Sequence, residues 1–286
     1  MAFLSYLIGG LGLGSVYAII ALGYSMVYGI AKMLNFAHGD VIMVGAFVAY
    51  FALSSFGLPT IVALILSVVA CTVLGIVVEK LAYKPLRGAS SLSVLITAIG
   101  VSYFLQNAAM LMWGTDTKIF PTILEGTLTI GELSIPYLTL LTILSCIVIM
   151  VVLTMFINKT KTGRAMRACS EDKGAASLMG INVNQIISIT FAIGSGLAAI
   201  AAVLLCATYP SVYPTLGSMP GIKAFTAAVL GGIGSIPGAF LGGLLLGVIE
   251  NLARAYISTQ LSDAIVFMVL IVILLIKPTG LLGKKV

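Results

Sequence analysis

Long uncharged runs of mainly apolar residues alternate with short polar segments along nearly the whole chain. An α-helix needs about 20 apolar residues to cross the hydrocarbon core of a bilayer, so each run of that length predicts a membrane span. The predicted spans lie at residues 1–31, 41–78 (two helices, broken at Gly57, Leu58 and Pro59), 91–113, 136–157, 183–208, 236–256 and 261–276. The pattern therefore predicts an all-α, polytopic integral membrane protein with about eight transmembrane helices.

Three segments interrupt this pattern with residues that disfavour a continuous helix. They are residues 32–40, residues 209–221 with their prolines, and the Gly-Gly-Ile-Gly-Ser-Ile-Pro-Gly run at 231–238. Because Pro and Gly are costly inside a helix, we expect broken or re-entrant segments there, with a short one at about 222–231. In transport proteins such backbone lines a water-filled path, although these segments could also be simple polar turns. The candidate pathway residues are Asn35, His38, Gly39, Asp40, Gly231, Gly232 and Gly234.

Composition adds to this picture by excluding other classes of protein. Hydrophobic residues make up 60% of the 286 residues and charged residues only 8%, whereas soluble domains are about 25% charged. A soluble enzyme, a disordered scaffold and a nucleic-acid-binding protein with its +6 charge on a basic face are therefore excluded. The whole chain, 1–286, is expected to form a single transmembrane domain with one large cytoplasmic loop at about 158–182.

The positions of the few charges predict an orientation, because Lys and Arg mark the cytoplasmic loops of membrane proteins. Most of them gather in four places, which are Lys32; Lys80, Lys84 and Arg87; Lys159, Lys161, Arg164, Arg167 and Lys173; and Lys277, Lys284 and Lys285. The segment 116–132 carries Asp116, Glu125 and Glu132 against Lys118 alone and is expected outside. We therefore expect the N-terminus outside the cell and the C-terminus in the cytoplasm.

Residue types that could carry out a reaction are scarce. His38 is the one histidine, which excludes a multi-histidine metal site, and the four cysteines have neither metal nor redox spacing and are expected to be small buried residues. No acidic pair stands at helical spacing within the spans, so an intramembrane enzyme is also excluded. Neither a catalytic residue nor a metal site is predicted.

Several polar residues in or near the spans have two possible roles. His38 could satisfy backbone groups freed at a helix break or form a proton-sensitive pair with Asp40. Asn35 and Asp40 could cap the next helix, or the same helix N-terminus could face a substrate carboxylate. Glu250 and Arg254, four residues apart, fit a structural ion pair better than a substrate clamp.

The polar stretch 158–184 has an order that a lipid-facing basic loop would not need. Two arginines at helical spacing are followed by two acidic residues, two alanines and a glycine. This order predicts a short cytoplasmic helix with small residues on a contact face and a glycine that turns the chain back. A helix of this kind would fit a groove on a partner. Its candidate contact residues are Arg164, Arg167, Glu171, Asp172, Ala175, Ala176 and Gly180.

The stretch from Glu171 to Ile181 resembles the coupling-helix signature of ATP-binding-cassette (ABC) importer permeases. The Asn-Phe-Ala-His-Gly-Asp segment at 35–40 resembles the one typical of branched-chain amino acid permeases. The likeness extends over nearly the whole chain, including its size, the basic loop and the glycine-rich run at 231–238. One departure is that Asp172 and Lys173 stand where the broader signature has Glu-Ala-Ala. The match is therefore better to the branched-chain subfamily than to the superfamily.

This resemblance implies a division of labour among several chains. Two permease subunits would form the pathway, two cytoplasmic ATPase subunits would close on nucleotide, and an external substrate-binding protein would deliver the amino acid. The chain has no G-x-x-x-x-G-K-[ST] phosphate loop, so ATP and Mg²⁺ would be bound by the partner subunits and this chain would carry no cofactor of its own. The expected location is the bacterial inner membrane, among lipid and without nucleic acid.

Other functions remain open at this point. Related permeases carry urea, short amides or other amino acids through similar scaffolds. A different class, a self-sufficient channel or secondary carrier, would use His38, Asp40 and Glu250 for ion coupling, but it would leave the order at 164–181 without a purpose.

Overall fold

The computed structural model describes residues 2–131 and 133–283, and the described chain is mainly helical. Glu132, Lys284 and Lys285, which contributed to the predicted orientation, lie outside the described residues. The long and apolar helices are α1 (Ala2–Ala31), α2 (His38–Ser54), α3 (Thr60–Val78), α4 (Ser91–Trp113), α5 (Tyr137–Lys159), α8 (Val183–Thr208), α9 (Ser218–Gly231), α10 (Ile236–Tyr256) and α11 (Ser262–Ile276). Six described helices could cross a membrane by length and hydropathy, and α2 and α11 are shorter apolar helices. The prediction of an all-α membrane protein with about eight spans is confirmed.

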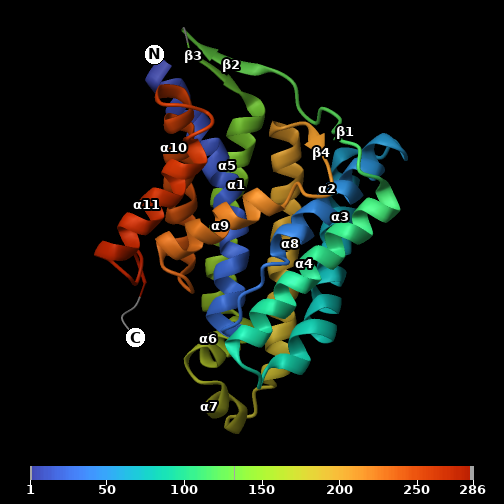
Figure 1. Ribbon diagram of the computed structural model, residues 1–286, viewed down its shortest axis with the longest axis vertical. Helices are drawn as coiled ribbons and strands as arrows, with labels where there is room; N and C mark the ends of the chain where they lie inside the picture. Colours follow the sequence, from blue (N-terminus) through green and yellow to red (C-terminus); the bar gives the residue numbers. More distant parts are fainter. Residues whose placement is uncertain (1, 132, 284–286) are drawn as a thin grey trace.

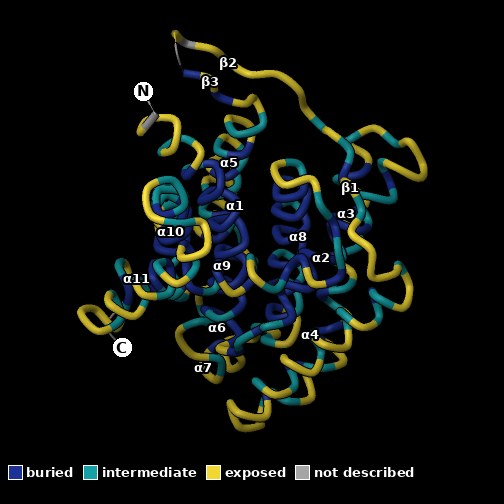
Figure 2. The backbone as a smooth tube through the Cα atoms, turned by 45° about the horizontal axis from the view of Figure 1, so that its top comes forward, coloured by how far each residue is buried: buried dark blue, intermediate teal, exposed yellow. Residues whose placement is uncertain are grey.

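The helices form a bundle around α1 and α8 (Figure 1). These two helices are mostly buried within the chain itself, whereas α3, α4 and α5 show much of their surface (Figure 2). In the most apolar 18-residue window of α8, 78% of the residues are buried, against 17% in α4. Apolar side chains exposed at this density are expected where a helix faces lipid or another transmembrane subunit.

Two interruptions fall where the sequence predicts them. α1 ends at Ala31, followed by Lys32 with a left-handed φ of 56°, and an irregular segment leads to α2. α9 lies across the middle of the molecule and is separated from α10 by Gly232 and Gly234, both with positive φ (Figure 1). α9 begins at Ser218, earlier than predicted, because Pro220 lies in its first turn, where its missing N–H costs no hydrogen bond.

Short strands and irregular helices join the spans. β1 (Lys118–Ile119) pairs antiparallel with β4 (Ser211–Val212), and β2 (Thr127–Ile130) pairs antiparallel with β3 (Leu133–Pro136). The β2–β3 hairpin lies at the same end of the molecule as the N-terminus, and the loop between α5 and α8 lies at the opposite end (Figure 1). α3 continues into a π-helical turn, η1 (Glu79–Tyr83), and a 3₁₀ turn, η2 (Lys84–Leu86).

Candidate functional site

The N-termini of α2 and α9 meet in the interior of the protein, at what we call the α2–α9 junction (residues 37–40 and 217–221). Gly39 and Gly217 approach so closely that a Cβ atom added at Gly217 would stand 1.7 Å from the Gly39 carbonyl oxygen. The N-cap residues, Ala37 and Gly217, have no side chain that could cap their helices. Because a helix N-terminus carries free N–H groups and a partial positive charge, the junction concentrates two such ends in one place.

A groove of about 250 Å³ opens beside this junction, between α2, α4 and α9. On its polar side, Gln106 Nε2 donates to Asp40 Oδ1 at 2.8 Å and lies 3.3 Å from the hydroxyl oxygens of Ser102 and Ser218. Asp40 is only 2% exposed. The other wall of the groove is apolar and is formed mainly by Ile99, Tyr103 and Ile222.

This arrangement suits a small molecule that carries both charges and an apolar side chain. A carboxylate would be stabilised by the helix N-termini, as anions are at such ends. An ammonium group would be stabilised by the Asp40 carboxylate, whose hydrogen-bonding partner Gln106 is uncharged. The apolar wall would take up the side chain.

Three side chains on the polar side of the groove, Ser102, Gln106 and Ser218, were not singled out from the sequence. Ser102 and Gln106 lie in the predicted span at 91–113, and Ser218 lies in the segment that was interpreted as a loop. The presence of a glutamine within a span is a signal that could have identified it, because polar residues within membrane helices usually face protein or a path. Its partner, 66 positions away, could not be identified from the sequence.

The other pathway candidates from the first interruption lie apart from this groove. The Asn35 side chain accepts a hydrogen bond from the Tyr83 hydroxyl at 2.8 Å, so the role as a cap of α2, which the sequence left open for it, is not the one observed. The His38 ring packs against Tyr24 with a centroid distance of 4.6 Å and occupies space left by Gly23. Its Nε2 atom is buried and has no partner among the described residues. His38 therefore packs against Tyr24, a role that was not proposed from the sequence, and Asp40 pairs with Gln106 instead.

Gly231, Gly232 and Gly234 form the tight turn between α9 and α10. A Cβ atom at Gly231 would stand 1.9 Å from the Gly238 carbonyl oxygen, and one at Gly232 would stand 2.4 Å from the Gly283 nitrogen. Ile233, within this turn, shares a small hollow with Asn35 and His38. The predicted pathway residues therefore divide into two groups: Gly39 and Asp40 line the groove, and the other five surround this turn.

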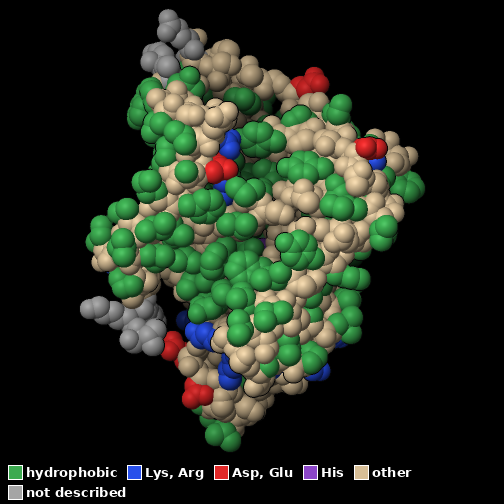
Figure 3. Space-filling view, viewed as in Figure 1, with side chains coloured by type: hydrophobic (Ala, Val, Ile, Leu, Met, Phe, Trp, Pro, Cys, Tyr) green, Lys and Arg blue, Asp and Glu red, His purple; other side chains and the backbone are tan. Residues whose placement is uncertain are grey.

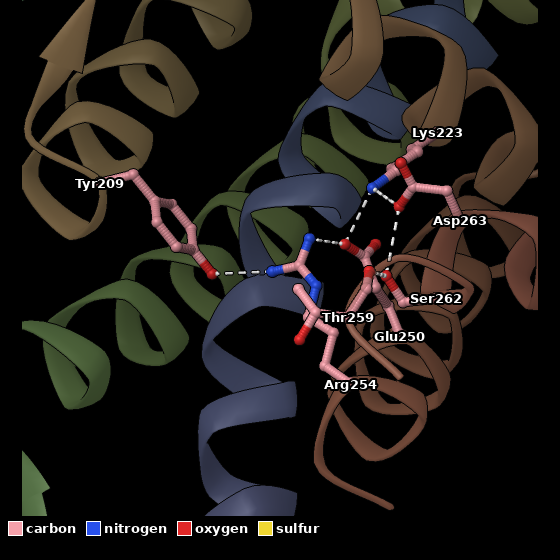
Figure 4. Close-up of polar contacts among 7 residues, drawn as sticks. All are labelled: Tyr209, Lys223, Glu250, Arg254, Thr259, Ser262 and Asp263. Atoms are coloured by element: carbon pink, nitrogen blue, oxygen red, sulfur yellow. Dashed lines mark hydrogen bonds and ion pairs between the residues drawn. The ribbon is translucent and has the colours of Figure 1, made fainter. Parts of the chain in front are cut away.

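A second polar group, which we call the ion-pair cluster, connects α9, α10 and α11 (Figure 4). Lys223 Nζ lies 2.8 Å from Glu250 Oε1 and 2.6 Å from Asp263 Oδ1, and Arg254 also pairs with Glu250. The side chain of Glu250 is fully buried and that of Lys223 is 5% exposed. The predicted pairing of Glu250 with Arg254 is confirmed, and Lys223, which belongs to none of the four groups of basic residues, has its partners here.

The loop between α5 and α8 contains two short helices rather than the single one predicted, α6 (Lys161–Glu171) and α7 (Lys173–Leu178). Asp172 separates them because its side chain accepts from the N–H groups of Gly174 and Ala175 at 2.7 and 3.0 Å, which caps α7. Gly180 turns the chain back with a φ of 81°, as predicted. The chain therefore presents α7 as a separate, capped unit at the tip of the loop.

The outer face of this loop differs in part from the predicted contact face. Arg164, Arg167, Glu171 and Ala175 are exposed, whereas Ala176 lies on the buried side of α7. Leu178 and Met179, at the tip, are 91% and 82% exposed, although both are apolar. These two residues were not predicted, because their exposure depends on the turn at Gly180. An exposed apolar tip surrounded by charges is typical of a protein contact surface.

Lys173 connects α7 to the end of α1. Its Nζ atom donates to the Ala31 carbonyl oxygen at 2.6 Å, which satisfies one of the carbonyl groups left free at a helix C-terminus. Burial, together with the nearby charges of Arg87 and Lys32, holds the pKa of Lys173 below its ordinary value. This hydrogen bond links α7 to the segment that leads from α1 into α2.

The cysteines are unbridged and buried, as the sequence predicts. Burial raises the pKa of the Cys169 thiol in α6, so this side chain behaves as a small apolar residue. Within residues 2–131 and 133–283, no three His, Cys, Asp or Glu side chains lie together in a way that could hold a metal ion.

Comparison with known proteins gives matches along nearly the full chain. A family model described as "Branched-chain amino acid transport system / permease component" matches residues 6–274. The high-affinity branched-chain amino acid transport system permease protein BraD of Pseudomonas aeruginosa is 48% identical, over 99% of this chain and 96% of that protein. The corresponding protein LivH of Escherichia coli K12 is 44% identical over the same shares.

One solved structure has a similar fold. PsaBC from Streptococcus pneumoniae in complex with Fab matches with a TM-score of 0.51 over 96% of this chain and 92% of that chain. Because only 14% of the residues are identical, this match supports a similar fold and nothing more.

Proposed function

The chain belongs to the family of branched-chain amino acid transport system permease components. From this membership we propose that it is a transmembrane subunit of an ABC importer for branched-chain or related hydrophobic amino acids. The observation that carries the proposal beyond family membership is the groove at the α2–α9 junction. It combines one carboxylate, two helix N-termini and an apolar wall, which are the groups that an aliphatic amino acid would contact.

In this proposal the substrate passes along the groove between α2, α4 and α9. The ammonium group would approach Asp40 and the carboxylate the first turns of α2 and α9, while Ile99 and Ile222 would contact the side chain. Weak binding is sufficient here, because an external binding protein selects the substrate and the permease has to release it. The exposed surface of α4 beside the groove is where we place the second permease subunit.

Energy would come from two cytoplasmic ATPase subunits that bind ATP and Mg²⁺, so the chain itself would not be an enzyme. Their docking surface would be α6 and α7, with the exposed Leu178 and Met179 at its centre. Closure of the ATPases would move α7, and the Lys173–Ala31 hydrogen bond would transmit this movement to α1 and the start of α2. In this proposal the α7 end lies in the cytoplasm, and the N-terminus and the β2–β3 hairpin lie on the outer side of the bacterial inner membrane.

Uptake of labelled leucine by proteoliposomes that contain the assembled importer tests the transport function. We expect uptake only with internal ATP and external binding protein, and competition by isoleucine and valine but not by urea or acetamide. Uptake by this chain alone, without ATP, would show a self-sufficient carrier instead.

The substitution Leu178→Asp tests the coupling surface. A carboxylate in the centre of an apolar contact stays unpaired and costs about 1–3 kcal/mol or more, so we expect the ATPase subunits to be lost on co-purification and uptake to fall at least about 10-fold. Phe56→Asp, an equally polar change at a 74% exposed residue of the opposite end, is the control and should retain the ATPases. Full retention in Leu178→Asp would refute the proposed docking surface.

A further inference from the structure

A cavity of about 400 Å³ lies between the end of α3 and the beginning of α8, and neither the transport path nor the docking surface uses it. Its polar side is formed mainly by Lys80, Lys84, Asn182, Asn184 and Gln185. Its apolar side is formed by Ile76, Ile189 and Ala192, which lie further along the two helices away from their polar ends. The cavity therefore has one cationic, hydrogen-bonding end and one apolar end.

The polar end lies where the membrane surface is expected. α3 has 19 residues, which at 1.5 Å per residue match the hydrocarbon core of about 30 Å. Lys80 and Lys84 follow directly after it, in the turns η1 and η2, and Asn182 directly precedes α8. The end of α3 and the start of α8 lie at the end of the molecule where α6 and α7 are found (Figure 1). Lys and Arg side chains are visible in the lower part of the space-filling view, toward the same end, and the surface above them is mostly apolar (Figure 3).

The two lysines of the cavity are free to bind an anion. Within the described residues neither has an ion pair, although a carboxylate is close in sequence. That carboxylate, Glu79, is fully buried, pairs with Arg87 and accepts a hydrogen bond from Ser188 at 2.6 Å. The local negative charge is therefore already neutralised, and the charges of Lys80 and Lys84 remain uncompensated.

The amide side chains at the cavity are oriented as donors. Asn182 Oδ1 accepts from the Gln185 backbone N–H at 3.1 Å, and Asn184 Oδ1 accepts from Arg87. Since both oxygens are occupied by donors, the two NH₂ groups are left to donate elsewhere. The N-terminus of the 26-residue α8 adds a partial positive charge at the same place.

Three exposed apolar residues of α3 and η1 each stand three positions before a residue that lines the cavity, and are therefore its neighbours on the helix surface. Val73, Val77 and Leu81 are 54%, 43% and 75% exposed, respectively, and lie on the same stretch as Ile76 and Lys80. An occupant with an anionic head and long apolar chains would match both ends of the cavity and this surface. A free phosphate ion would use the polar end alone.

We propose that this cavity is a binding site for an anionic phospholipid, with the phosphate headgroup held by Lys80, Lys84 and the amide groups of Asn182 and Asn184, and an acyl chain lying along Ile76 and Ala192. A lipid at this place would bridge α3 and α8 beside Glu79 and Ser188, and so help to fix the start of α8, where the loop between α5 and α8 ends.

The experiment uses the assembled importer in nanodiscs that contain a photoactivatable phosphatidylglycerol, with a phosphatidylcholine probe of the same chains as reference. After irradiation, peptides are mapped by mass spectrometry. We expect phosphatidylglycerol to label residues 76–84 and 182–192 and phosphatidylcholine to label them far less. Each lysine near an anionic headgroup contributes about a fivefold factor in affinity, so Lys80→Gln with Lys84→Gln should lower this labelling by about 30-fold.

Lys159→Gln with Lys161→Gln is the matched control, because it removes the same charge from the same end of the protein outside the cavity. Equal loss in the control variant, equal labelling by both probes, or unchanged labelling in the Lys80/Lys84 variant would each overturn the proposal. A heat-stability gain of the delipidated assembly with inorganic phosphate alone would reassign the cavity to a free anion. Labelling that appears only after the ATPase subunits are removed would reassign it to a protein contact.

Discussion

The α2–α9 junction and the ion-pair cluster share one short helix, yet they satisfy polar groups in the membrane in opposite ways. At the junction, α9 approaches α2 backbone to backbone, and Asp40 is held by the uncharged Gln106. In the cluster, Lys223, the residue after the groove-lining Ile222, is bound to two carboxylates, one of which also binds Arg254. One region keeps a single carboxylate and two helix ends available, and the other leaves each charge with an opposite charge.

The difference indicates what each region is for. A buried charge without an opposite charge is costly, so it is retained where a ligand can compensate it. A cluster in which every charge is compensated has little left to offer a ligand, but it fixes the relative positions of α9, α10 and α11. We infer that the cluster fixes α9 to α10 and α11 at Lys223, directly after the groove-lining Ile222, while the N-terminus of α9 serves the substrate.

The largest effect is expected from Gly217→Ala at the junction. The added Cβ atom would meet the backbone of Gly39 at 1.7 Å, and backbone cannot move aside as a flexible side chain can. Overpacking costs about 1–3 kcal/mol and occasionally more, and here we expect more than about 3 kcal/mol, with little folded protein recovered on gel filtration. Gly100→Ala, where no atom lies within 4 Å, should be tolerated. If both variants fold alike, the two helix ends are not in contact.

A smaller loss of stability is expected from Lys223→Met in the ion-pair cluster. Removing one partner of a buried ion pair costs about 3–5 kcal/mol, and because Glu250 keeps Arg254 we expect the lower end of that range as a fall in thermal stability in detergent. Asp263→Asn is the control, since that side chain is 41% exposed and its pair contributes about 0–1 kcal/mol. If the cluster bound substrate instead of holding the helices, Lys223→Met would abolish transport without lowering thermal stability.

The smallest effect on stability, with a clear effect on transport, is expected from Asp40→Asn. The amide oxygen can still accept the hydrogen bond from Gln106, so thermal stability should change by less than about 1 kcal/mol. Loss of the charge-assisted bond to an ammonium group, about 1.5–3 kcal/mol, should lower leucine uptake by about 10-fold or more. Asp116→Asn, an exposed acid outside the spans, should transport normally. Normal uptake in Asp40→Asn would remove the distinction between the two regions.

Much of the fold could be predicted from the sequence because it depends on local patterns. The apolar runs located the helices, and the glycine and proline segments located the breaks after Ala31 and Gly231. Gly180 was predicted as a turn and has the left-handed φ that glycine tolerates best. In the loop between α5 and α8 one helix was predicted, but the structure has two, because Asp172 caps the second. A cap requires a particular backbone conformation at Asp172, and the residue type alone does not show that this conformation is adopted.

The candidate site was predicted only in part. Asp40 and Gly39 were named because they lie at a break, which a local pattern reveals. No local pattern indicates that Gln106 contacts Asp40, or that the His38 ring packs against Tyr24 instead. In the sequence Leu178 and Met179 resemble ordinary apolar residues, and only the turn after α7 in the structure shows that they are exposed.

The sequence by itself determined that this protein crosses the membrane, where its helices break and which loop carries the basic charge, because hydrophobicity and backbone hydrogen bonding act over one helix at a time. Only the tertiary structure decided that the ends of α2 and α9 meet through glycines 178 positions apart in the chain, that Lys223 belongs with Glu250 and Asp263, and that Lys173 reaches Ala31. Such contacts depend on how whole helices pack, and small residues and paired charges fix that packing without leaving a periodic signal in the chain.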